Sequence, residues 1–197
     1  MPNIGFVNGQ FMPLEDARVP VEDRAFQFAD GVYEVIRTYR GIPYQVEAHL
    51  ARLERSARAI ELPLPFRAQE WKDFIAEGLQ RAGFPESKIY LQLTRGVAPR
   101  DHVFPVGAPP TAVMTVREMH GVDSTLRASG VSAVTMPDLR WGRCDIKSVN
   151  LLPNVMALQR ARTSGAFEAI FIRDGAVTEG SVSNVVMVSG DTLVTPP

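Results

Sequence analysis

The chain has 197 residues, of which 45% are hydrophobic and 22% are charged, as in an ordinary folded globular protein. Its 21 basic and 22 acidic residues leave a formal net charge of -1, which argues against a dedicated nucleic-acid surface. Because no apolar run approaches a membrane span, no signal peptide is evident and Cys144 has no second cysteine to pair with, we expect a cytoplasmic protein.

The first half of the chain is predicted to combine short strands with two amphipathic helices. Asn8-Gly9 is typical of a two-residue hairpin turn, and alternating β-forming residues over 32–39 predict a strand. Apolar residues that recur at helical spacing predict a helix over 47–60. The other expected elements are strands over 4–7, 10–14, 42–46, 88–96 and 111–119, and a helix over 68–83 that ends at a glycine.

The pattern breaks near position 120, where we place a boundary between a domain of residues 1–119 and a domain of residues 120–197. In the second domain, Asn150 is expected to cap a helix that runs through 155–163. Strands are expected over 130–136, 167–175, 176–180, 181–190 and 191–195. The predicted class is α+β, with helices on one side of each strand-rich half. Since one helix and a few hairpins make a thin domain, we expect the second domain to be incomplete in this chain.

Sequence motifs exclude several classes of enzyme. The chain has no phosphate-binding P-loop and no glycine-rich dinucleotide fingerprint. It has no cysteine pair for zinc, its three histidines are far apart, and it has no G-x-S-x-G nucleophile turn. We therefore expect no metal site, and the candidates for chemistry are charged residues near the ends of predicted elements.

Two such residues lie in the second predicted domain, Lys147 in DIKS and Glu179 in TEGS. A lysine can form a Schiff base with a carbonyl when its amine is desolvated or lies beside another cation. For a single lysine a solvated side chain is the commoner situation, because lysine is mostly exposed. The Glu179 carboxylate could pair with a cationic ring nitrogen, or it could face solvent in a turn.

Three more charged residues lie in the first predicted domain. Arg100 and His102 are two positions apart, so in extended backbone their side chains share a face. They could bind a carboxylate together, since a guanidinium binds carboxylate with two hydrogen bonds, or they could belong to a charged loop. Arg52 lies near the edge of the apolar face of its helix, where it could bind an anion or remain solvated.

Five segments of the chain, in order and with consistent spacing, together resemble one enzyme family. They are EDRAFQFADGVYEV, HLARL, IYLQLTRGVAPRDHVFP, RWGRCDIKSVNLL and TEGSVSNVV. They resemble consecutive motifs of the fold-type IV pyridoxal-phosphate aminotransferases, and most of all those of the bacterial D-amino acid aminotransferases. The resemblance implies the two-domain fold-type IV architecture and transfer of the amino group of a D-amino acid to a 2-oxo acid.

The resemblance also implies roles for seven residues. Lys147 matches the lysine that carries pyridoxal phosphate and serves as general base and then acid. Glu179 matches the carboxylate that keeps the pyridine nitrogen protonated, so that the ring can accept electron density. The other matches are Arg52 for the cofactor phosphate, Arg140 near the phenolic oxygen, and Tyr33, Arg100 and His102 for the α-carboxylate of the substrate.

In that family Arg100 and His102 would reach across from a partner subunit, which implies a homodimer that takes small amino acids and 2-oxo acids. Three other functions stay open. A branched-chain L-amino acid aminotransferase would share Lys147, Glu179 and Arg52 but would not need the Arg100/His102 pair. An aminodeoxychorismate lyase uses the same fold to eliminate pyruvate, and a truncated chain could be an inactive dimerisation module. The family continues beyond this chain with a further phosphate-binding helix start.

Overall fold

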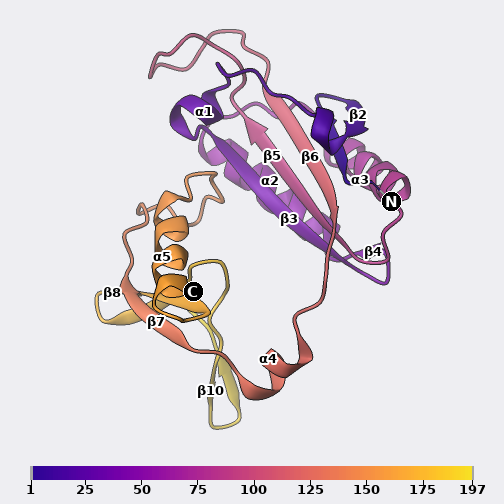
Figure 1. Ribbon diagram of the computed structural model, residues 1–197. Helices are drawn as coiled ribbons and strands as arrows, with labels where there is room; N and C mark the ends of the chain where they lie inside the picture. Colours follow the sequence, from indigo (N-terminus) through magenta and orange to yellow (C-terminus); the bar gives the residue numbers. More distant parts are fainter. Residues whose placement is uncertain (1, 197) are drawn as a thin grey trace. The chain divides into compact units, whose positions relative to one another are not determined.

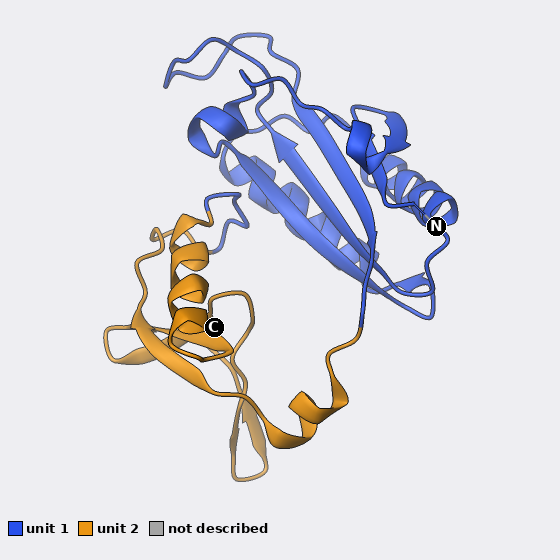
Figure 2. Cartoon of the chain, viewed as in Figure 1, with its two compact units in different colours: residues 1–120, 145–150 blue, residues 121–144, 151–197 orange. Residues whose placement is uncertain are grey.

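The computed structural model describes residues 2–196 and divides them between two compact units (Figure 2). Unit 1 consists of the residues up to His120 together with Asp145–Asn150, and unit 2 consists of Gly121–Cys144 together with the residues from Leu151 onward. The segment that contains Lys147 therefore packs with unit 1, although it follows residue 120 in the sequence. The division into domains 1–119 and 120–197 stays a prediction about folding units.

Unit 1 is built on a six-stranded antiparallel sheet with the strand order β2-β1-β6-β5-β3-β4 (Figure 1). Its strands are β1 (Ile4–Val7), β2 (Gln10–Pro13), β3 (Gly31–Tyr39), β4 (Ile42–Pro43), β5 (Ser87–Thr94) and β6 (Thr111–Glu118). The predicted hairpin turn at Asn8-Gly9 is confirmed, since both residues have positive φ angles, 47° and 94°. All the strands predicted in this half are present, and β4 is shorter than expected.

Two amphipathic helices, α2 (Val46–Ala59) and α3 (Ala68–Ala82), cover one face of this sheet (Figure 1). Burial of their apolar faces against the sheet stabilises both helices, at roughly 25 cal/mol per Å² of apolar surface. The buried residues at helical spacing include Leu50, Leu53 and Ala57 on α2 and Trp71, Ile75 and Ala82 on α3. Both predicted helices are confirmed, and α3 ends as predicted at Gly83, whose φ is 68°.

The predicted strand over 42–46 is wrong beyond Pro43. Gln45 takes a left-handed conformation with a φ of 54° and begins α2, so the chain turns into a helix before the strand can lengthen. As a result β4 pairs only with Thr38 and Tyr39, at the end of β3. The outer edge of the rest of β3 is left for another segment of the chain.

Unit 2 contains a three-stranded sheet with the order β7-β8-β9, a helix packed on it, and a separate two-stranded hairpin (Figure 1). Because β7 and β8 are parallel, the chain crosses back between them through α5. The elements are α4 (Ser124–Ser129), β7 (Ala133–Pro137), α5 (Leu152–Thr163), β8 (Glu168–Arg173), β9 (Ala176–Gly180), β10 (Met187–Ser189) and β11 (Thr192–Val194). The α+β class is confirmed.

Some predicted details of unit 2 are wrong. Asn150 does not cap α5, which begins at Leu152 and has no side-chain hydrogen bond at its cap position, Leu151. The strand expected over 181–190 is reduced to β10, because the residues after Gly180 form a turn. The short helices α1 (Arg24–Phe28), α4 and the 3-10 turn η1 (Leu14–Asp16) were not predicted, since one turn is too short for helical periodicity to show.

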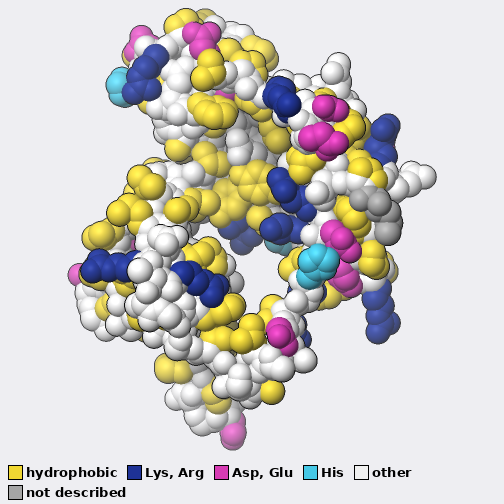
Figure 3. Space-filling model, viewed as in Figure 1, with side chains coloured by type: hydrophobic (Ala, Val, Ile, Leu, Met, Phe, Trp, Pro, Cys, Tyr) yellow, Lys and Arg dark blue, Asp and Glu magenta, His cyan; other side chains and the backbone are white. Residues whose placement is uncertain are grey.

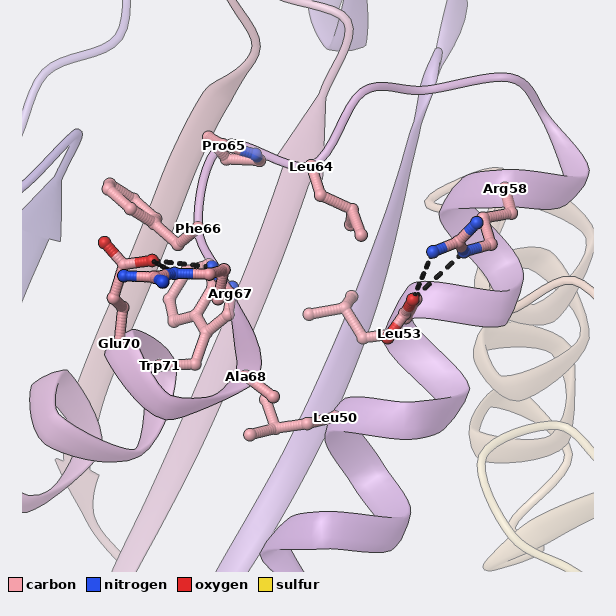
Figure 4. A pocket seen from close by; sticks show the side chains of 11 residues that line it. Leu50, Leu53, Arg58, Leu64, Pro65, Phe66, Arg67, Ala68, Glu70 and Trp71 are labelled. Atoms are coloured by element: carbon pink, nitrogen blue, oxygen red, sulfur yellow. Dashed lines mark hydrogen bonds and ion pairs between the residues drawn. The ribbon is translucent and has the colours of Figure 1, made fainter.

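A pocket of about 310 Å³ lies between α2 and α3 in unit 1 (Figure 4). Its apolar lining includes Leu53, Phe66 and Trp71, and its charged lining includes the Glu54–Arg58 and Arg67–Glu70 ion pairs. None of the seven predicted site residues is among the residues that line it. The candidate active site therefore has to be sought elsewhere in the chain.

Unit 2 has a small hydrophobic core and, in comparison, many exposed hydrophobic side chains. The buried core residues are Ala157, Ala161, Ala166, Ala169 and Phe171. Val182, Val188 and Leu193 are each more than 70% exposed. Figure 3 shows hydrophobic side chains at the surface of the molecule, interspersed with charged ones. Within residues 2–196 no helix is both long and apolar enough to cross a bilayer.

Candidate active site

The segment that contains Lys147, Asp145–Asn150, lies along the outer edge of β3. It is held there by a β-bridge from Val32 to Ser148, and by hydrogen bonds from Tyr33 N to Lys147 O (2.9 Å) and from Val149 N to Gly31 O (3.0 Å). Ile146 is buried in the core of unit 1 and anchors the segment. Because β4 is short, this segment satisfies backbone groups of β3 that would otherwise lie on an open sheet edge.

The side chain of Lys147 lies against the aromatic ring of Tyr33. Its Nζ atom is 3.3 Å from the Tyr33 hydroxyl and 4.4 Å from the ring centroid, a cation–π distance. Tyr33 stacks on Tyr90 with 5.6 Å between ring centroids. Burial, with a contribution from Tyr33, raises the pKa of Tyr90 to about 12, so its hydroxyl stays protonated and donates to Gln92 at 2.7 Å. The lysine amine therefore lies over a tyrosine ring that is itself held in place by a second tyrosine.

The backbone of Lys147 is also fixed to α2. Its N–H donates to the Oγ atom of Ser56 at 3.1 Å, and Ser56 is buried. Arg52 lies four residues before Ser56, and residues four apart lie on one face of a helix. The backbone of Lys147 is therefore bonded to α2 at a position one helical turn from Arg52, although the two predicted residues belong to distant parts of the sequence.

Arg52 is paired with a fully buried carboxylate, Glu34 on β3. Its Nε and Nη2 atoms both donate to that carboxylate, the second at 2.8 Å, and His49 Nδ1 lies 2.8 Å from the same group. Burial raises the pKa of Glu34, but the hydrogen bonds from Arg52 and His49 outweigh burial and leave that pKa below its ordinary value. The hydrogen bond from Arg52 to Glu34 in turn raises the pKa of the guanidinium.

Arg100 and His102 both contact the ring of Phe28 on α1. The guanidinium carbon of Arg100 is 4.5 Å from the ring centroid, and the His102 and Phe28 ring centroids are 5.0 Å apart. Both side chains are exposed. In the described part of the chain, neither is joined by a hydrogen bond or ion pair to Tyr33 or Lys147. The fold of one chain therefore brings Tyr33 to the lysine but leaves the other two predicted substrate-binding residues apart.

The loop that carries Arg100 and His102 is supported by a buried charge cluster. Asp30 accepts hydrogen bonds from Arg24 Nε at 2.8 Å and from Arg95 Nε at 2.8 Å. Arg24 also donates to the backbone carbonyl of Asp101, the residue between the two exposed side chains, at 2.6 Å. The loop backbone is thus connected to a fixed part of unit 1.

In unit 2 the two predicted cofactor residues Arg140 and Glu179 contact each other. Arg140 Nη1 donates to Glu179, while its Nε and Nη2 donate to Asp138 at 3.0 and 2.9 Å. Thr178 donates to the same Asp138 at 2.9 Å, and the Asp138 side chain is fully buried. Burial raises the pKa of Asp138, but hydrogen bonds from Arg140 and Thr178 lower it well below its ordinary value. Asp138 therefore orients the arginine that contacts Glu179.

The turn that follows Glu179 is fixed by a second buried carboxylate. Glu168 accepts hydrogen bonds from the Oγ atoms of Ser181 and Ser183, the latter at 2.8 Å. A Cβ atom on Gly180 would lie 2.7 Å from the backbone carbonyl oxygen of Ser183, so the turn in TEGSVSN favours glycine at this position. Burial raises the pKa of Glu168, but the hydrogen bonds from the two serines lower it below its ordinary value.

Sequence reasoning missed the residues that hold these side chains in place. They are Glu34, His49, Ser56, Tyr90, Asp138 and Glu168. A signal for Glu34 was available, because a carboxylate at an inward position of a strand needs a partner, and Arg52 is on the next helix. Ser56 gave no such signal, since it accepts a hydrogen bond from the backbone N–H of Lys147, a residue 91 positions away in the sequence.

Comparisons with known proteins point to aminotransferases. The family described as amino-transferase class IV matches residues 31–197. A D-alanine aminotransferase of Bacillus licheniformis is 44% identical over 96% of this chain and 67% of its own length. One from Staphylococcus haemolyticus is 41% identical over 98% of this chain and 68% of its own length.

Solved structures of aminotransferases share the fold. A branched-chain aminotransferase of Thermoproteus uzoniensis matches with a TM-score of 0.85 and 26% identity, over 98% of this chain and 68% of that chain. A pyridoxal-phosphate-bound hypothetical aminotransferase of Mycobacterium tuberculosis matches with a TM-score of 0.82 and 28% identity, over 98% of this chain and 71% of that chain.

Proposed function

The chain belongs to the class IV amino-transferases, and we propose that it uses pyridoxal phosphate to transfer the amino group of a D-amino acid to a 2-oxo acid. The observation that carries this proposal is the Lys147 amine, 3.3 Å from the Tyr33 hydroxyl in the part of the chain that matches the family. Relatives named D-alanine aminotransferase are 38–44% identical, against 26% for the branched-chain enzyme of Thermoproteus uzoniensis. This difference favours D-amino acids as substrates over branched-chain L-amino acids.

The donor groups of this chain fit pyridoxal phosphate chemically. An aldehyde, a phosphate and a ring nitrogen are bound by an amine, a guanidinium and a carboxylate. In unit 1, Lys147 and Arg52 supply the amine and the guanidinium. In unit 2, Glu179 supplies the carboxylate, and Arg140 stays the proposed residue for the phenolic oxygen.

Lys147 is the residue proposed to carry the cofactor and to move the proton. Pyridoxal phosphate, when bound, supplies a carbonyl for the amino group and a ring that delocalises negative charge from the α-carbon. The Nζ atom of Lys147, when it is not bonded to the cofactor, would accept the α-proton of the substrate and return it. The Tyr33 hydroxyl, 3.3 Å from Nζ, is placed to orient the amine during both transfers.

Tyr33, Arg100 and His102 are proposed to bind the α-carboxylate of the substrate, because a guanidinium and a carboxylate form two parallel hydrogen bonds. Since Arg100 and His102 are exposed, we propose that they act in the site of a second copy of this chain, which makes the enzyme a homodimer. The exposed apolar side chains beside them on the same loop, Val103 and Phe104, support such an interface. The cytoplasm stays the proposed location.

The test is the visible spectrum of the purified protein with pyridoxal phosphate, together with transamination between D-alanine and 2-oxoglutarate. We expect Lys147→Ala to remove the absorbance of the lysine-bound cofactor and to lower the rate by about 10²–10⁴-fold or more, the usual share of general acid–base catalysis. Lys72→Ala is the matched control, because Lys72 forms an ion pair with the exposed Glu47 and belongs to no proposed site. It should keep both the spectrum and the rate.

Two results would contradict the proposal. Amino transfer from L-leucine with none from D-alanine would change the substrate class to branched-chain L-amino acids. A folded protein that takes up no pyridoxal phosphate, with or without Lys147, would be an inactive module.

A further inference from the structure

We infer that Glu34 is the positioning residue of Arg52: it fixes the plane of the guanidinium so that the remaining N–H groups of Arg52 face an anionic phosphate. The inference rests on the proposed function, in which Arg52 binds the phosphate of the cofactor. Glu34 itself is not expected to touch the cofactor, and it acts through Arg52.

The hydrogen bonds between Glu34 and Arg52 have the geometry that such a role requires. Arg52 Nε donates to one carboxylate oxygen of Glu34, and Nη2 donates to the other at 2.8 Å. Because a guanidinium is planar, two parallel hydrogen bonds to one carboxylate set both its plane and its rotation. The Nη1 group points away from this pair and donates to no protein atom within residues 2–196.

The two partners are buried to different extents, so one side of the ion pair faces the protein interior and the other side faces solvent. The Glu34 side chain is 0% exposed, whereas the Arg52 side chain is 44% exposed. A fully buried carboxylate keeps its cationic partner, because loss of the partner would leave a buried charge uncompensated. Arg52 is therefore fixed at its inner edge and remains accessible at its outer edge.

An ion pair on the same helix shows what an ordinary surface pair looks like. Arg58 Nε and Nη2 both donate to one oxygen of Glu54, and both side chains are substantially exposed. One shared oxygen leaves the guanidinium free to rotate about that contact. The Glu34–Arg52 pair differs in using both carboxylate oxygens and in being closed to solvent on one side.

Glu34 is itself held from more than one direction. His49 Nδ1 lies 2.8 Å from its Oε2 atom, and the backbone N–H of Val35 donates to the same oxygen at 3.3 Å. His49 is three residues before Arg52 on α2, so the two side chains converge on the carboxylate from one helix face. The Glu34 carboxylate is thus held in one position, and its hydrogen bonds orient the guanidinium of Arg52.

Adjacent residues of β3 therefore orient the two groups of unit 1 that are proposed to hold the cofactor. Successive side chains of a strand point to opposite faces, so Tyr33 and Glu34 face opposite sides of the sheet. Tyr33 contacts the amine of Lys147, and Glu34 holds the guanidinium of Arg52. The positions of the Lys147 and Arg52 side chains are therefore both fixed relative to the same short stretch of β3.

The test compares two ligands that differ in the phosphate. We expect Glu34→Gln, in the full chain freed of cofactor, to raise the dissociation constant of pyridoxal phosphate about 10-fold or more, which corresponds to about 1.4 kcal/mol. The dissociation constant of pyridoxal, which lacks the phosphate, should change less than about twofold. Both constants are measured by absorbance titration at equilibrium. Glu54→Gln, the matched control on α2, should change neither.

Equal weakening of both ligands would show a general structural role for Glu34 and overturn the inference, and so would unchanged affinity for pyridoxal phosphate. If circular dichroism shows that Glu34→Gln does not fold, Glu34→Asp provides the same comparison, because it keeps the buried negative charge. Aspartate is one methylene shorter and cannot keep both parallel hydrogen bonds to Arg52 in place. We expect the same phosphate-selective loss, and wild-type affinity in this variant would overturn the inference.

The outcome for the wild-type chain separates this inference from the proposed function. If the wild-type chain binds no pyridoxal phosphate, both are wrong. If the wild-type chain binds the cofactor and transfers amino groups, and a folded Glu34 variant binds pyridoxal phosphate equally well, only the positioning role is wrong.

Discussion

A buried carboxylate holds an arginine in each of the two units, Glu34 with Arg52 in unit 1 and Asp138 with Arg140 in unit 2. In both carboxylates burial raises the pKa, but hydrogen bonds from the arginine outweigh it, so the pKa falls below its ordinary value. Loss of the arginine would leave a fully buried carboxylate without a charge partner, so the pairs stay formed. The orientation of each arginine is therefore set before any ligand arrives, which lowers the entropic cost of binding.

At the scale of single residues, Arg100 offers a test of the substrate-binding assignment. We expect Arg100→Ala to raise the KM for D-alanine about 10-fold or more, because two charge-assisted hydrogen bonds to the α-carboxylate are lost. The visible spectrum of the bound cofactor should not change, since the Arg100 guanidinium donates to the carbonyl of Gln27 and lies over the ring of Phe28, neither of which is proposed to hold the cofactor.

Arg81→Ala is the matched control for Arg100→Ala. Arg81 also lies over an aromatic ring, with its guanidinium carbon 4.8 Å from the ring centroid of Phe11, against 4.5 Å between Arg100 and Phe28. The Arg81→Ala variant should therefore reproduce any effect of removing a cation–π contact, but it should not raise the KM for D-alanine. Unchanged D-alanine kinetics in Arg100→Ala would remove this residue from the substrate site.

At the scale of elements, the position of Lys147 depends on the length of β4. The short strand Ile42–Pro43 covers only the end of β3, and Asp145–Asn150 pairs with the beginning of the same edge. A strand of the predicted length over 42–46 would compete for that edge. The left-handed turn at Gln45, which begins α2 early, therefore contributes to the site without carrying any of its chemistry.

Gly96, two residues after the end of β5, tests how the loop with Arg100 and His102 is joined to the sheet. Its φ is 89°, and a Cβ atom there would lie 2.0 Å from the carbonyl oxygen of Pro109. Gly107 has a φ of 72° but no atom within 4 Å of an added Cβ. We expect Gly96→Ala to lower the free energy of unfolding by about 2 kcal/mol or more beyond the loss in Gly107→Ala, because only the first substitution adds a backbone clash. Urea denaturation of the two variants measures this difference, and equal losses would contradict it.

At the scale of the whole molecule, both units should lose stability in acid. Glu34 and Glu168 have pKa values below their ordinary 4.5, so the unfolded chain binds protons that the native protein does not. Their contribution to stability is complete above pH 4.5 and is lost as the pH falls through the lowered values. We expect the urea midpoint to fall steadily below about pH 4.5 and the fall to be smaller in Glu34→Gln. A midpoint that does not change between neutral pH and about pH 3 would contradict this prediction.

Local sequence determined most of the sheet of unit 1 and the two helices that cover it. The Asn8-Gly9 hairpin and the helices α2 and α3 follow from turn chemistry and apolar spacing, which act between near neighbours along the chain. Family membership was also readable, because the motifs around Arg52, Lys147 and Glu179 occur in order in the sequence. The prediction that Asn150 caps α5 was wrong because the occurrence of asparagine at helix N-caps is only a statistical preference. Asn150 instead ends the segment that packs on β3, and α5 begins after it, at Leu152.

The tertiary structure alone decided what surrounds each candidate residue. Lys147 and Tyr33 are 114 residues apart in sequence, and only the pairing of Asp145–Asn150 with β3 brings the amine to the hydroxyl. Likewise, Glu34 became a partner of Arg52 only because α2 packs on the face of the sheet toward which Glu34 points. Sequence periodicity shows which face of an element is buried, but the identity of the residue across that interface depends on strand order and register, which are set by contacts along the whole chain.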